Sequence, residues 1–476
     1  MKVAFVTFGC RLNRAESLDL EARYRAAGHE IIALRGSRFS STESGGPRSC
    51  ATDIPDLILV RGCSVTAKAQ RDCEKAIAHL RARFPTSEIR PLGCLPNAQT
   101  GSVPLENIPV AETGRARSPS APQSHLSTAV SARPPYQISQ QSHPPTPIPT
   151  STSRAYLKIQ DGCNGKCTFC IVPHFRGAPV SVPFDEITVR MKSYLAAGYR
   201  EIVLTGCNLS LYHSRLLQNQ DNTHGRARSP SAPQSHLSAA VSARPPYQVL
   251  QLPQTGHNLA SLLVALAELG SVPARIRIGS LEPGPWCDDI LDVMVEHPNI
   301  CKFLHLSLQS ASDRILKRMN RPYEITWAER FCTAARERLG TDLALGADII
   351  TGFPGETEED FEAPRAFLVR HAFSNLHVFP YSERPGTSAA TMDGSVPRSV
   401  RLVRARNLTA LGRAQRAAFA QTFLGREVEV CVERGGEHGW TDAYLPCKWK
   451  GPAERRSLVR KRVIAVDGDT LLASTT

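Results

Sequence analysis

The amino-acid sequence predicts an α/β protein with a doubly wound parallel sheet, then a full or partial (β/α) barrel, then a small β module. Three observations support this fold class. Short apolar runs alternate with helix-like stretches in two separate parts of the chain, which is typical of parallel sheets. A segment rich in Pro and Ser divides these two parts. The stretch from Phe423 to the end holds strand-like runs without intervening helices.

The first part, residues 1–112, has a βαβ-like pattern. Strands are expected at Lys2–Gly9, His29–Leu34, Asp56–Val60 and Glu88–Leu92, and helices at Glu16–Ala27 and Thr66–Phe84. Strands that alternate with helices form a parallel sheet, so their carboxyl ends lie at one edge.

The second part, residues 154–395, continues the alternation over about six βα units. Strands are expected at Ala155–Gln160, Glu201–Thr205, Arg275–Gly279, Phe303–Gln309, Leu343–Thr351 and Asn375–Tyr381. Helices are expected at Phe184–Ala197, Asp288–Glu296 and Glu359–Arg370. Polar and Gly residues follow most of these strands, and in such barrels the chemistry lies at the carboxyl ends of the strands.

Two nearly identical 24-residue segments interrupt this pattern, Gly114–Gln137 and Gly225–Gln248, which differ only at Thr128 and Ala239. Their Pro, Ser and Arg content cannot bury enough apolar surface to fold, so both are expected to be disordered insertions. The first belongs to a linker at 113–153. The second lies in a surface insert at about 214–255 within the barrel part.

The last part of the chain is basic. A helix is expected at Ser399–Phe423, and strands at Arg426–Glu433 and Val463–Ala473. The corresponding division of the chain is a basic helical segment at 396–422 and a β module at 423–476. Val396–Thr476 holds 15 Lys and Arg against 8 Asp and Glu, a large share of the net charge of +13. This excess is compatible with nucleic-acid contact or with a solvated basic surface.

Bulk properties exclude several classes of protein. No apolar run approaches the ~18 residues that span a membrane, and the first residues resemble a strand rather than a signal peptide. A cytoplasmic protein without a membrane partner is therefore expected. Fourteen cysteines then favour metal or redox chemistry over disulfides. Eight of them show no ligand spacing and are expected to be small hydrophobes or surface thiols: Cys50, Cys73, Cys207, Cys287, Cys301, Cys332, Cys431 and Cys447.

Cys163, Cys167 and Cys170 have the spacing C-x3-C-x2-C. Three thiolates this close can each hold one iron of a [4Fe–4S] cluster. The fourth iron then stays open and can chelate the amino and carboxylate groups of S-adenosylmethionine (SAM). The alternative is a zinc site with His174 as fourth ligand.

The surrounding segment Tyr156–Gly177, YLKIQDGCNGKCTFCIVPHFRG, resembles the cluster loop of the radical SAM methylthiotransferases. The resemblance implies a barrel of the radical SAM type, whose cluster reduces SAM and releases a 5′-deoxyadenosyl radical that abstracts a hydrogen from an unactivated carbon. It also implies a set of residues that line the SAM pocket: Phe169 in the loop, Gly206 and Asn208 of T-G-x-N, Ser280 and Glu282 of S-x-E-P, and Gln309 and Ser310 of the Q-S pair.

A second set of cysteines, Cys10, Cys63 and Cys94, is spread along the first part of the chain. Each follows a predicted parallel strand, so the sheet is expected to bring them together at one edge. The resemblance to the family's N-terminal domain implies a second [4Fe–4S] cluster here, one that supplies or carries the inserted sulfur. Cys50 lies in the intervening Ser- and Gly-rich stretch and is a rival ligand that the pattern disfavours.

Three branches of the family are compatible with the sequence. They modify N6-isopentenyladenosine in tRNA, N6-threonylcarbamoyladenosine in tRNA, or an aspartate of a ribosomal protein. Gly9–Asn13, Leu304–Asn320 and Leu376–Thr387 are most similar to the threonylcarbamoyladenosine branch. The C-terminal module resembles the TRAM domain, an RNA-binding β-barrel, through Gly439–Leu445. The candidates for RNA contact are Arg426, Trp440, Lys448 and Lys450.

The expected function is therefore methylthiolation of C2 of N6-threonylcarbamoyladenosine at position 37 of tRNA. It would use two [4Fe–4S] clusters and SAM, with tRNA, a sulfur source and an electron donor of the flavodoxin or ferredoxin type as partners. No protein acid or base is obligatory, because the cofactor carries the chemistry. A zinc-bearing RNA-binding protein without catalysis is the alternative from another class, and whether the insertions leave the enzyme active stays open.

Overall fold

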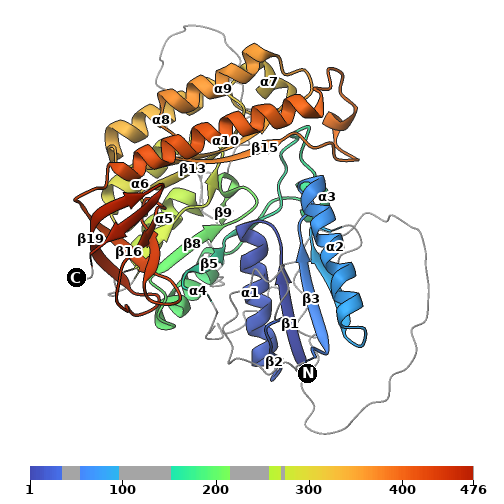
Figure 1. The fold of residues 1–476 in the computed structure, drawn as a ribbon, viewed down its shortest axis with the longest axis vertical. Coiled ribbons are helices and arrows are strands. Elements are labelled where there is room, and N and C mark those ends of the chain that lie inside the picture. The colour runs from blue at the N-terminus through green and yellow to red at the C-terminus, as the bar shows by residue number, and fades with distance from the viewer. Residues whose placement is uncertain (35–53, 96–151, 215–256, 270–273, 475–476) are drawn as a thin grey trace, which may run out of the picture.

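The structure, a computed structural model, describes residues 1–34, 54–95, 152–214, 257–269 and 274–474. Both 24-residue segments, Cys50, nearly all of the predicted linker at 113–153 and most of the predicted insert at 214–255 lie outside these residues. Figure 1 shows an N-terminal sheet, a central layered body and a small C-terminal barrel, in that order along the chain.

The N-terminal sheet is parallel and has the order β2-β1-β3-β4. Its strands are β1 (Lys2–Thr7), β2 (Glu30–Ile31), β3 (Leu57–Gly62) and β4 (Glu88–Gly93). Helix α1 (Arg11–Ala26) packs Leu20 and Tyr24 on one face, and α2 (Ala67–Arg83) packs Ile77 and Leu80 on the other. The predicted doubly wound arrangement is confirmed. However, α1 begins five residues before the predicted Glu16, because the extended chain ends at its N-cap, Cys10.

The central body consists of two parallel sheets with the orders β5-β8-β11 and β12-β13-β14-β15. The strands are β5 (Ala155–Lys158), β8 (Glu201–Thr205), β11 (Arg275–Arg277), β12 (Ser280–Leu281), β13 (Phe303–Gln309), β14 (Ala344–Thr351) and β15 (Asn375–Pro380). Only Ile278 and Gly279 separate β11 from β12, so one segment carries the chain from the first sheet into the second. Within the described residues, β5 and β15 are edge strands of these sheets, which corresponds to the partial barrel of the prediction.

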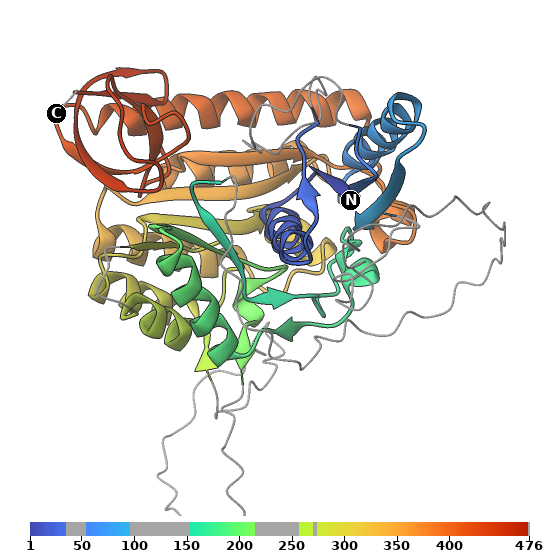
Figure 2. The same ribbon diagram turned by 90° about the horizontal axis from the view of Figure 1, so that it is seen from below.

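Helices cover the outer side of this partial barrel (Figures 1 and 2). They are α4 (Phe184–Ala196), α5 (Leu259–Ala267), α6 (Cys287–Glu296), α7 (Asp313–Arg318), α8 (Ile325–Leu339), α9 (Glu358–Arg370) and α10 (Arg398–Gln421). Short elements complete the body: α3 (Val172–Arg176), β6 (Gln160–Asp161), β7 (Val180–Ser181), β9 (His213–Ser214), β10 (His257–Asn258), η2 (Leu209–Leu211) and η3 (Ser388–Thr391). None of the described helices has the length and apolarity to cross a membrane.

The alternation of β13 decides which side chains face inward. Leu304, Leu306 and Leu308 belong to the large hydrophobic core under the helices. Successive side chains of a strand point to opposite faces, so His305 lies on the other, inner face. The functional side chains of the central body therefore have to be sought on this inner face and at the strand ends.

The C-terminal module is a closed five-stranded barrel, β16-β17-β18-β20-β19. Its strands are β16 (Glu427–Val432), β17 (His438–Thr441), β18 (Pro446–Lys448), β19 (Leu458–Asp467) and β20 (Thr470–Ala473). The prediction of one strand over Val463–Ala473 is wrong. A tight turn at Gly468, whose φ is +59°, divides this stretch into a hairpin in which Asp467 pairs with Thr470.

A buried charge cluster joins the C-terminal barrel to the central body. Glu201 of β8 is fully buried and accepts hydrogen bonds of 2.8 Å from Nε of Arg275 and of 2.8 Å from Nε of Arg277. The remaining guanidinium N–H groups donate to main-chain carbonyls of the barrel, those of Glu429 and Thr441 among them. Burial by itself would raise the pKa of Glu201, but the two arginines hold it well below its usual range.

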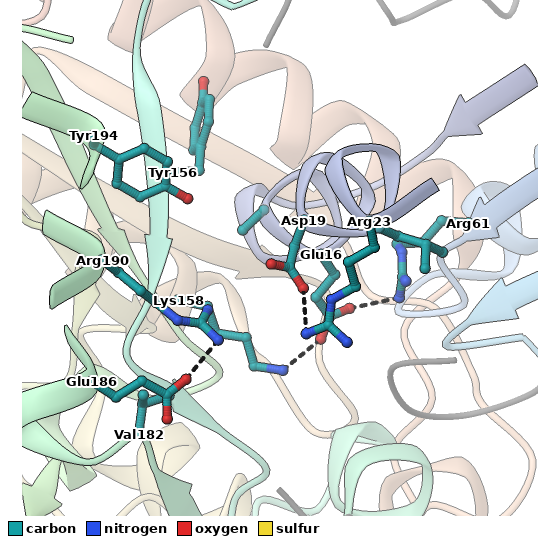
Figure 3. A pocket seen from close by; sticks show the side chains of 12 residues that line it. Glu16, Asp19, Arg23, Arg61, Tyr156, Lys158, Val182, Glu186, Arg190 and Tyr194 are labelled. Carbon is teal, nitrogen blue, oxygen red and sulfur yellow. Dashed lines mark hydrogen bonds and ion pairs between the residues drawn. The ribbon is translucent and has the colours of Figure 1, made fainter. Parts of the chain in front are cut away.

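A second cluster joins the N-terminal sheet to the central body. Glu16 of α1 accepts from Arg61 of β3 at 2.7 Å, from Lys158 of β5 at 2.8 Å and from Arg176 of α3 at 2.9 Å. Burial by itself would raise the pKa of Glu16, but the three cations hold it well below its usual range. Figure 3 shows the pocket beside this cluster, between α1, β5 and α4, where Asp19 pairs with Arg23. The charges that line the pocket thus pair with one another.

Replacing Glu201 by Ala is expected to lower the free energy of unfolding by about 3–5 kcal/mol, because it leaves two guanidinium groups buried without their carboxylate. Urea denaturation measures the loss. The matched control is Glu329→Ala, which removes a surface ion pair of 2.7 Å with Arg370 and should cost about 1 kcal/mol or less. Equal losses in the two variants would contradict the assigned role of Glu201.

Glu16→Gln is expected to destabilise the protein most at neutral pH. Since the pKa of Glu16 is depressed in the folded state, its contribution is fully present above its unfolded value of about 4.3 and is lost as pH falls through the folded pKa. The difference in free energy of unfolding between wild type and variant should therefore shrink below about pH 4. Urea unfolding at several pH values, with the exposed Glu74→Gln as control, measures it. A pH-independent difference would contradict the role of the carboxylate charge.

Candidate iron–sulfur and SAM site

The first cysteine set lies in a loop at the carboxyl end of the first barrel strand. Gly162 precedes it with φ +66°, and a Cβ at this position would lie 2.0 Å from the carbonyl oxygen of Ala178. The chain can therefore turn here only without a side chain. The N–H of Cys163 donates to the carbonyl of Gly177 at 3.0 Å, which closes the loop at its far end.

The three thiols of this loop face a common region. The N–H of Gly165 donates to Sγ of Cys163 at 3.2 Å, and Nη1 of Arg321 donates to Sγ of Cys167 at 3.2 Å. Burial raises the pKa of Cys163, and it raises the pKa of Cys170 to about 11, with the neighbouring thiols adding to both effects. Both of these thiols are therefore protonated at neutral pH in the metal-free protein, and binding a metal has to displace their protons.

The spacing of the thiols tests which metal they fit. Tetrahedral zinc holds sulfur ligands ~3.8 Å apart, given a Zn–S bond of about 2.3 Å. Among the described residues, one set of three His, Cys, Asp or Glu ligand atoms lies within 4.8 Å of one another, and it is His305, Asp348 and His377. Cys163, Cys167, Cys170 and His174 form no such set among the described residues. Three thiolates are the donor set that iron–sulfur clusters use.

A chain of polar contacts connects the loop to the strand ends. Nη2 of Arg321 pairs with Glu282 at 2.7 Å, and Nδ2 of Asn208 donates to the other carboxylate oxygen of Glu282 at 2.9 Å. The N–H of Asn208 donates to Oε1 of Gln160, just before the loop, at 2.9 Å. The structure thus brings two of the residues predicted to line the SAM pocket, Asn208 and Glu282, to the cysteine loop.

Three further residues predicted to line the SAM pocket, Gly206, Ser280 and Gln309, lie at strand ends near these polar contacts. A Cβ on Gly206 would lie 2.9 Å from the carbonyl oxygen of Gln160, so the close approach of β8 to the loop requires glycine. Ser280 is half-buried and pairs in register with His305. Gln309 has φ +65° and follows a register shift in β13, which changes the direction of the strand as it ends.

The two other predicted pocket residues have partners within the protein. Phe169 packs edge-on against Phe353, with their ring centroids 6.3 Å apart. Ser310 is buried, and its hydroxyl accepts from the N–H of Ser312 at the start of α7. In this structure the hydroxyl of Ser310 thus stabilises a turn.

The second cysteine set lies at the carboxyl edge of the N-terminal sheet. Cys10 follows β1, Cys63 follows β3 and Cys94 follows β4. A Cβ on Gly9 would lie 2.6 Å from Cβ of Cys63, so the two strand ends are in close contact. Burial raises the pKa of Cys63 to about 12, and the nearby thiols of Cys10 and Cys94 add to this effect. The sheet therefore gathers three cysteines that are remote in sequence.

Arg176 connects the two cysteine sets. It follows the first cysteine loop, and its Nε donates to Sγ of Cys94 at 3.2 Å, while Nη1 pairs with Asp161 at 2.9 Å. Arg176 and Arg321 are not among the residues predicted from the sequence, although both contact a cysteine sulfur. Arg176 lies within the segment that carried the family resemblance, whereas no pattern in the sequence distinguishes Arg321.

The cysteines without ligand spacing behave mostly as predicted. Cys73, Cys287, Cys301, Cys332, Cys431 and Cys447 are buried. Cys73 lies behind the second set and accepts from the N–H of Cys63 at 3.4 Å. Cys207 is half-buried, and its thiol donates to Asp161 at 3.3 Å.

The predicted RNA contacts fall into two groups. Nη1 and Nη2 of Arg426 donate to the two carboxylate oxygens of Asp342 at 2.7 and 2.5 Å. The ring of Trp440 stacks on the ring of Tyr444, with the ring centroids 4.9 Å apart. Lys448 and Lys450 are exposed. Arg460 and Arg462, which are not among the predicted RNA contacts, are also exposed on β19.

Known proteins resemble this chain over almost its whole length. The radical SAM superfamily model matches residues 157–368. The threonylcarbamoyladenosine tRNA methylthiotransferase MtaB of Bacillus subtilis is 29% identical over 470 residues, covering 94% of this chain and 90% of the relative. The tRNA-2-methylthio-N(6)-dimethylallyladenosine synthase of Mycolicibacterium paratuberculosis is 30% identical, and the match covers 90% of this chain and 75% of the relative.

Among solved structures, the radical S-adenosylmethionine methyltransferase TsrM from Kitasatospora setae is similar with a TM-score of 0.47 and 13% identity, covering 82% of this chain and 77% of that one. The superfamily match includes the cysteine loop and the strands that carry Asn208, Glu282 and Gln309. The relatives cover 94% and 90% of the chain, so their similarity extends well beyond the superfamily match. The chain therefore belongs to the radical SAM methylthiotransferase family.

Proposed function

We propose that this enzyme methylthiolates C2 of N6-threonylcarbamoyladenosine at position 37 of tRNA. The observation that carries the proposal is the pair of three-cysteine sites joined by Arg176, because one site suits SAM cleavage and the other suits storage of the sulfur to be inserted. The choice of nucleoside is supported by relatives from Bacillus subtilis and Aquifex aeolicus, both named threonylcarbamoyladenosine tRNA methylthiotransferase, which cover 94% and 97% of the chain.

Cys163, Cys167 and Cys170 would hold the SAM-cleaving [4Fe–4S] cluster. When bound, this cluster supplies the electron that cleaves SAM. The residues around it position the reactants. Arg321 places a positive charge on Sγ of Cys167 and fixes the carboxylate of Glu282. That carboxylate is nearly buried, so it is a suitable hydrogen-bond acceptor for the amino group of SAM.

Cys10, Cys63 and Cys94 would hold a second [4Fe–4S] cluster. Cys63 and Cys94 are buried, whereas Cys10 is exposed. The contact of Cys94 with Arg176 favours a bound anionic group, since the guanidinium offsets negative charge at Sγ of Cys94. The proposal further requires a sulfur source and an external electron donor of the flavodoxin or ferredoxin type. No side chain has to act as acid or base, because the cofactor carries the chemistry.

The C-terminal barrel would act as a TRAM-like tRNA-binding module. Lys448 and Lys450 are exposed at β18, and Arg460 and Arg462 are exposed on β19. Exposed cations on one small barrel suit contacts with phosphates, which position an RNA without reading its sequence. A tRNA substrate would place the activity in the cytoplasm. We assign the other parts of the chain to three further units. Residues 1–112 would hold the second cluster, residues 154–395 would bind SAM, and residues 396–422 would form the helix that leads to the barrel.

A second candidate is methylthiolation of N6-isopentenyladenosine, because a relative that is 30% identical is named tRNA-2-methylthio-N(6)-dimethylallyladenosine synthase. The two candidates share both cysteine sites and differ only in the N6 substituent. The nucleosides of the tRNA therefore distinguish them.

Anaerobically purified and reconstituted protein is expected to be brown and to bind about eight irons per chain, four for each cluster. Cys163→Ala and Cys94→Ala should each leave about four irons, because each loses a ligand of one cluster only. Iron analysis and visible absorption measure the iron content. The control is Cys332→Ala, which changes a buried cysteine outside both sets and should still bind about eight irons per chain. About four irons in the unmodified protein would exclude the second cluster, and a colourless zinc protein would exclude both.

Deletion of the gene in its host is expected to abolish 2-methylthio-N6-threonylcarbamoyladenosine and leave the unthiolated nucleoside. Mass spectrometry of digested tRNA measures both. Complementation with the intact gene, but not with Cys167→Ala, should restore the modification. Loss of the methylthio group from N6-isopentenyladenosine instead would select the second candidate.

A further inference from the structure

Three side chains on neighbouring strands of the barrel meet outside both cysteine sites. His305 belongs to β13, Asp348 to β14 and His377 to β15. Asp348 pairs in register with His377, and His305 pairs in register with Gly346, two residues before Asp348. Alternation along the strands puts all three on the inner face, opposite the core residues of the same strands.

Their ligand atoms are close enough to share one ion. Nε2 of His305 lies 3.0 Å from Oδ1 of Asp348, and Nδ1 of His377 lies 3.1 Å from the same oxygen. Neighbouring ligands of an octahedral ion are about 3.0 Å apart when each bond is about 2.1 Å. Two histidines and one carboxylate on one face are also the ligand set that leaves the remaining positions of a divalent iron-type ion open.

One ring nitrogen of His305 has no partner among the described residues. The side chain is buried, with 1% of the residue exposed, and Nδ1 has no hydrogen-bond partner there, whereas Nε2 lies beside the carboxylate of Asp348. Gly346 leaves the space for the ring, because a Cβ there would be 2.5 Å from Nδ1 of His305.

We propose that His305, Asp348 and His377 form a binding site for one divalent transition-metal cation such as Mn²⁺ or Fe²⁺. The three ligand atoms all lie within 4.8 Å of one another, as atoms that share one ion must.

Strand β13 links this site to the first cysteine set. His377 is half exposed, and the carbonyl of Ser307, two residues along β13 from His305, accepts from the same guanidinium of Arg321 that contacts Cys167. Arg11 of α1 adds positive charge near His305. A cation and an arginine side by side favour an anionic oxygen ligand in the open positions.

The substrate of the proposed function carries such a ligand. The threonylcarbamoyl group ends in a carboxylate, whereas the isopentenyl group has no polar atom. The cation would therefore bind the substrate carboxylate and select the nucleoside. This step rests on the proposed function, while the cation site itself does not.

Mn²⁺ is the probe for the site. It prefers oxygen and imidazole over thiolate ligands, and cluster-loaded protein keeps the cysteines occupied. In holoenzyme, the electron paramagnetic resonance signal of free Mn²⁺ should show one bound ion per chain. His377→Ala and Asp348→Asn should raise the Kd at least about tenfold, as expected for loss of a ligand or its orientation. The exposed His438→Gln should leave it unchanged.

Equal binding by wild type, His377→Ala and Asp348→Asn would overturn the site, as would no binding by wild type. Gly346→Ala tests whether the position of His305 matters. The variant keeps all three ligand side chains, but its added Cβ would displace the ring of His305. It should weaken Mn²⁺ binding while circular dichroism and iron content stay at wild-type values. Unchanged Mn²⁺ affinity in Gly346→Ala would also count against the site.

A separate measurement tests whether the cation selects the nucleoside. The nucleoside N6-threonylcarbamoyladenosine should lower the Kd for Mn²⁺ in the holoenzyme, and N6-isopentenyladenosine should not. The same Kd with both nucleosides would overturn the substrate contact. The nucleosides of deletion-strain tRNA test the proposed function without reference to Mn²⁺, so the two failures are distinguishable.

Discussion

The contact of Glu16 with three cations fixes the geometry on which the catalytic part of the structure depends. Lys158 comes from the first barrel strand, Arg61 from the N-terminal sheet and Arg176 from the end of the cysteine loop. The carboxylate therefore sets α1 against β5, at the edge where the partial barrel is open. Because Arg176 also reaches Sγ of Cys94, the same cluster determines how the two cysteine sites are placed relative to each other.

A buried carboxylate also holds the C-terminal barrel against the central body. Glu201 orients Arg275 and Arg277, and their remaining N–H groups bind carbonyls of the C-terminal barrel. Buried charges of this kind are stable only when each one has its partners. They tolerate little displacement, so the module that carries the exposed basic side chains is held in one orientation toward the inner face.

Metal binding and assembly of the sites are linked through the thiols. Burial raises the pKa of Cys63 and of Cys170, so both are protonated without metal at neutral pH. Thiolates form only with the gain of bonds to a metal. The arginines at Cys94 and Cys167 are already in place to offset the charge of the thiolates. The protein thus prepares the surroundings of both sites, while the metal completes them.

The sequence by itself determined the parallel sheets, the strand positions and the cysteine loop, because each follows from local periodicity or from spacing within a few residues. Only the tertiary structure decided what depends on contacts between distant segments. It showed that Arg176 and Arg321 reach the cysteine sulfurs, that Trp440 and Arg426 have partners inside the protein, and that Val463–Ala473 is a hairpin. It also brought His305, Asp348 and His377 together, since strand register, which local sequence does not encode, sets which side chains meet across a sheet.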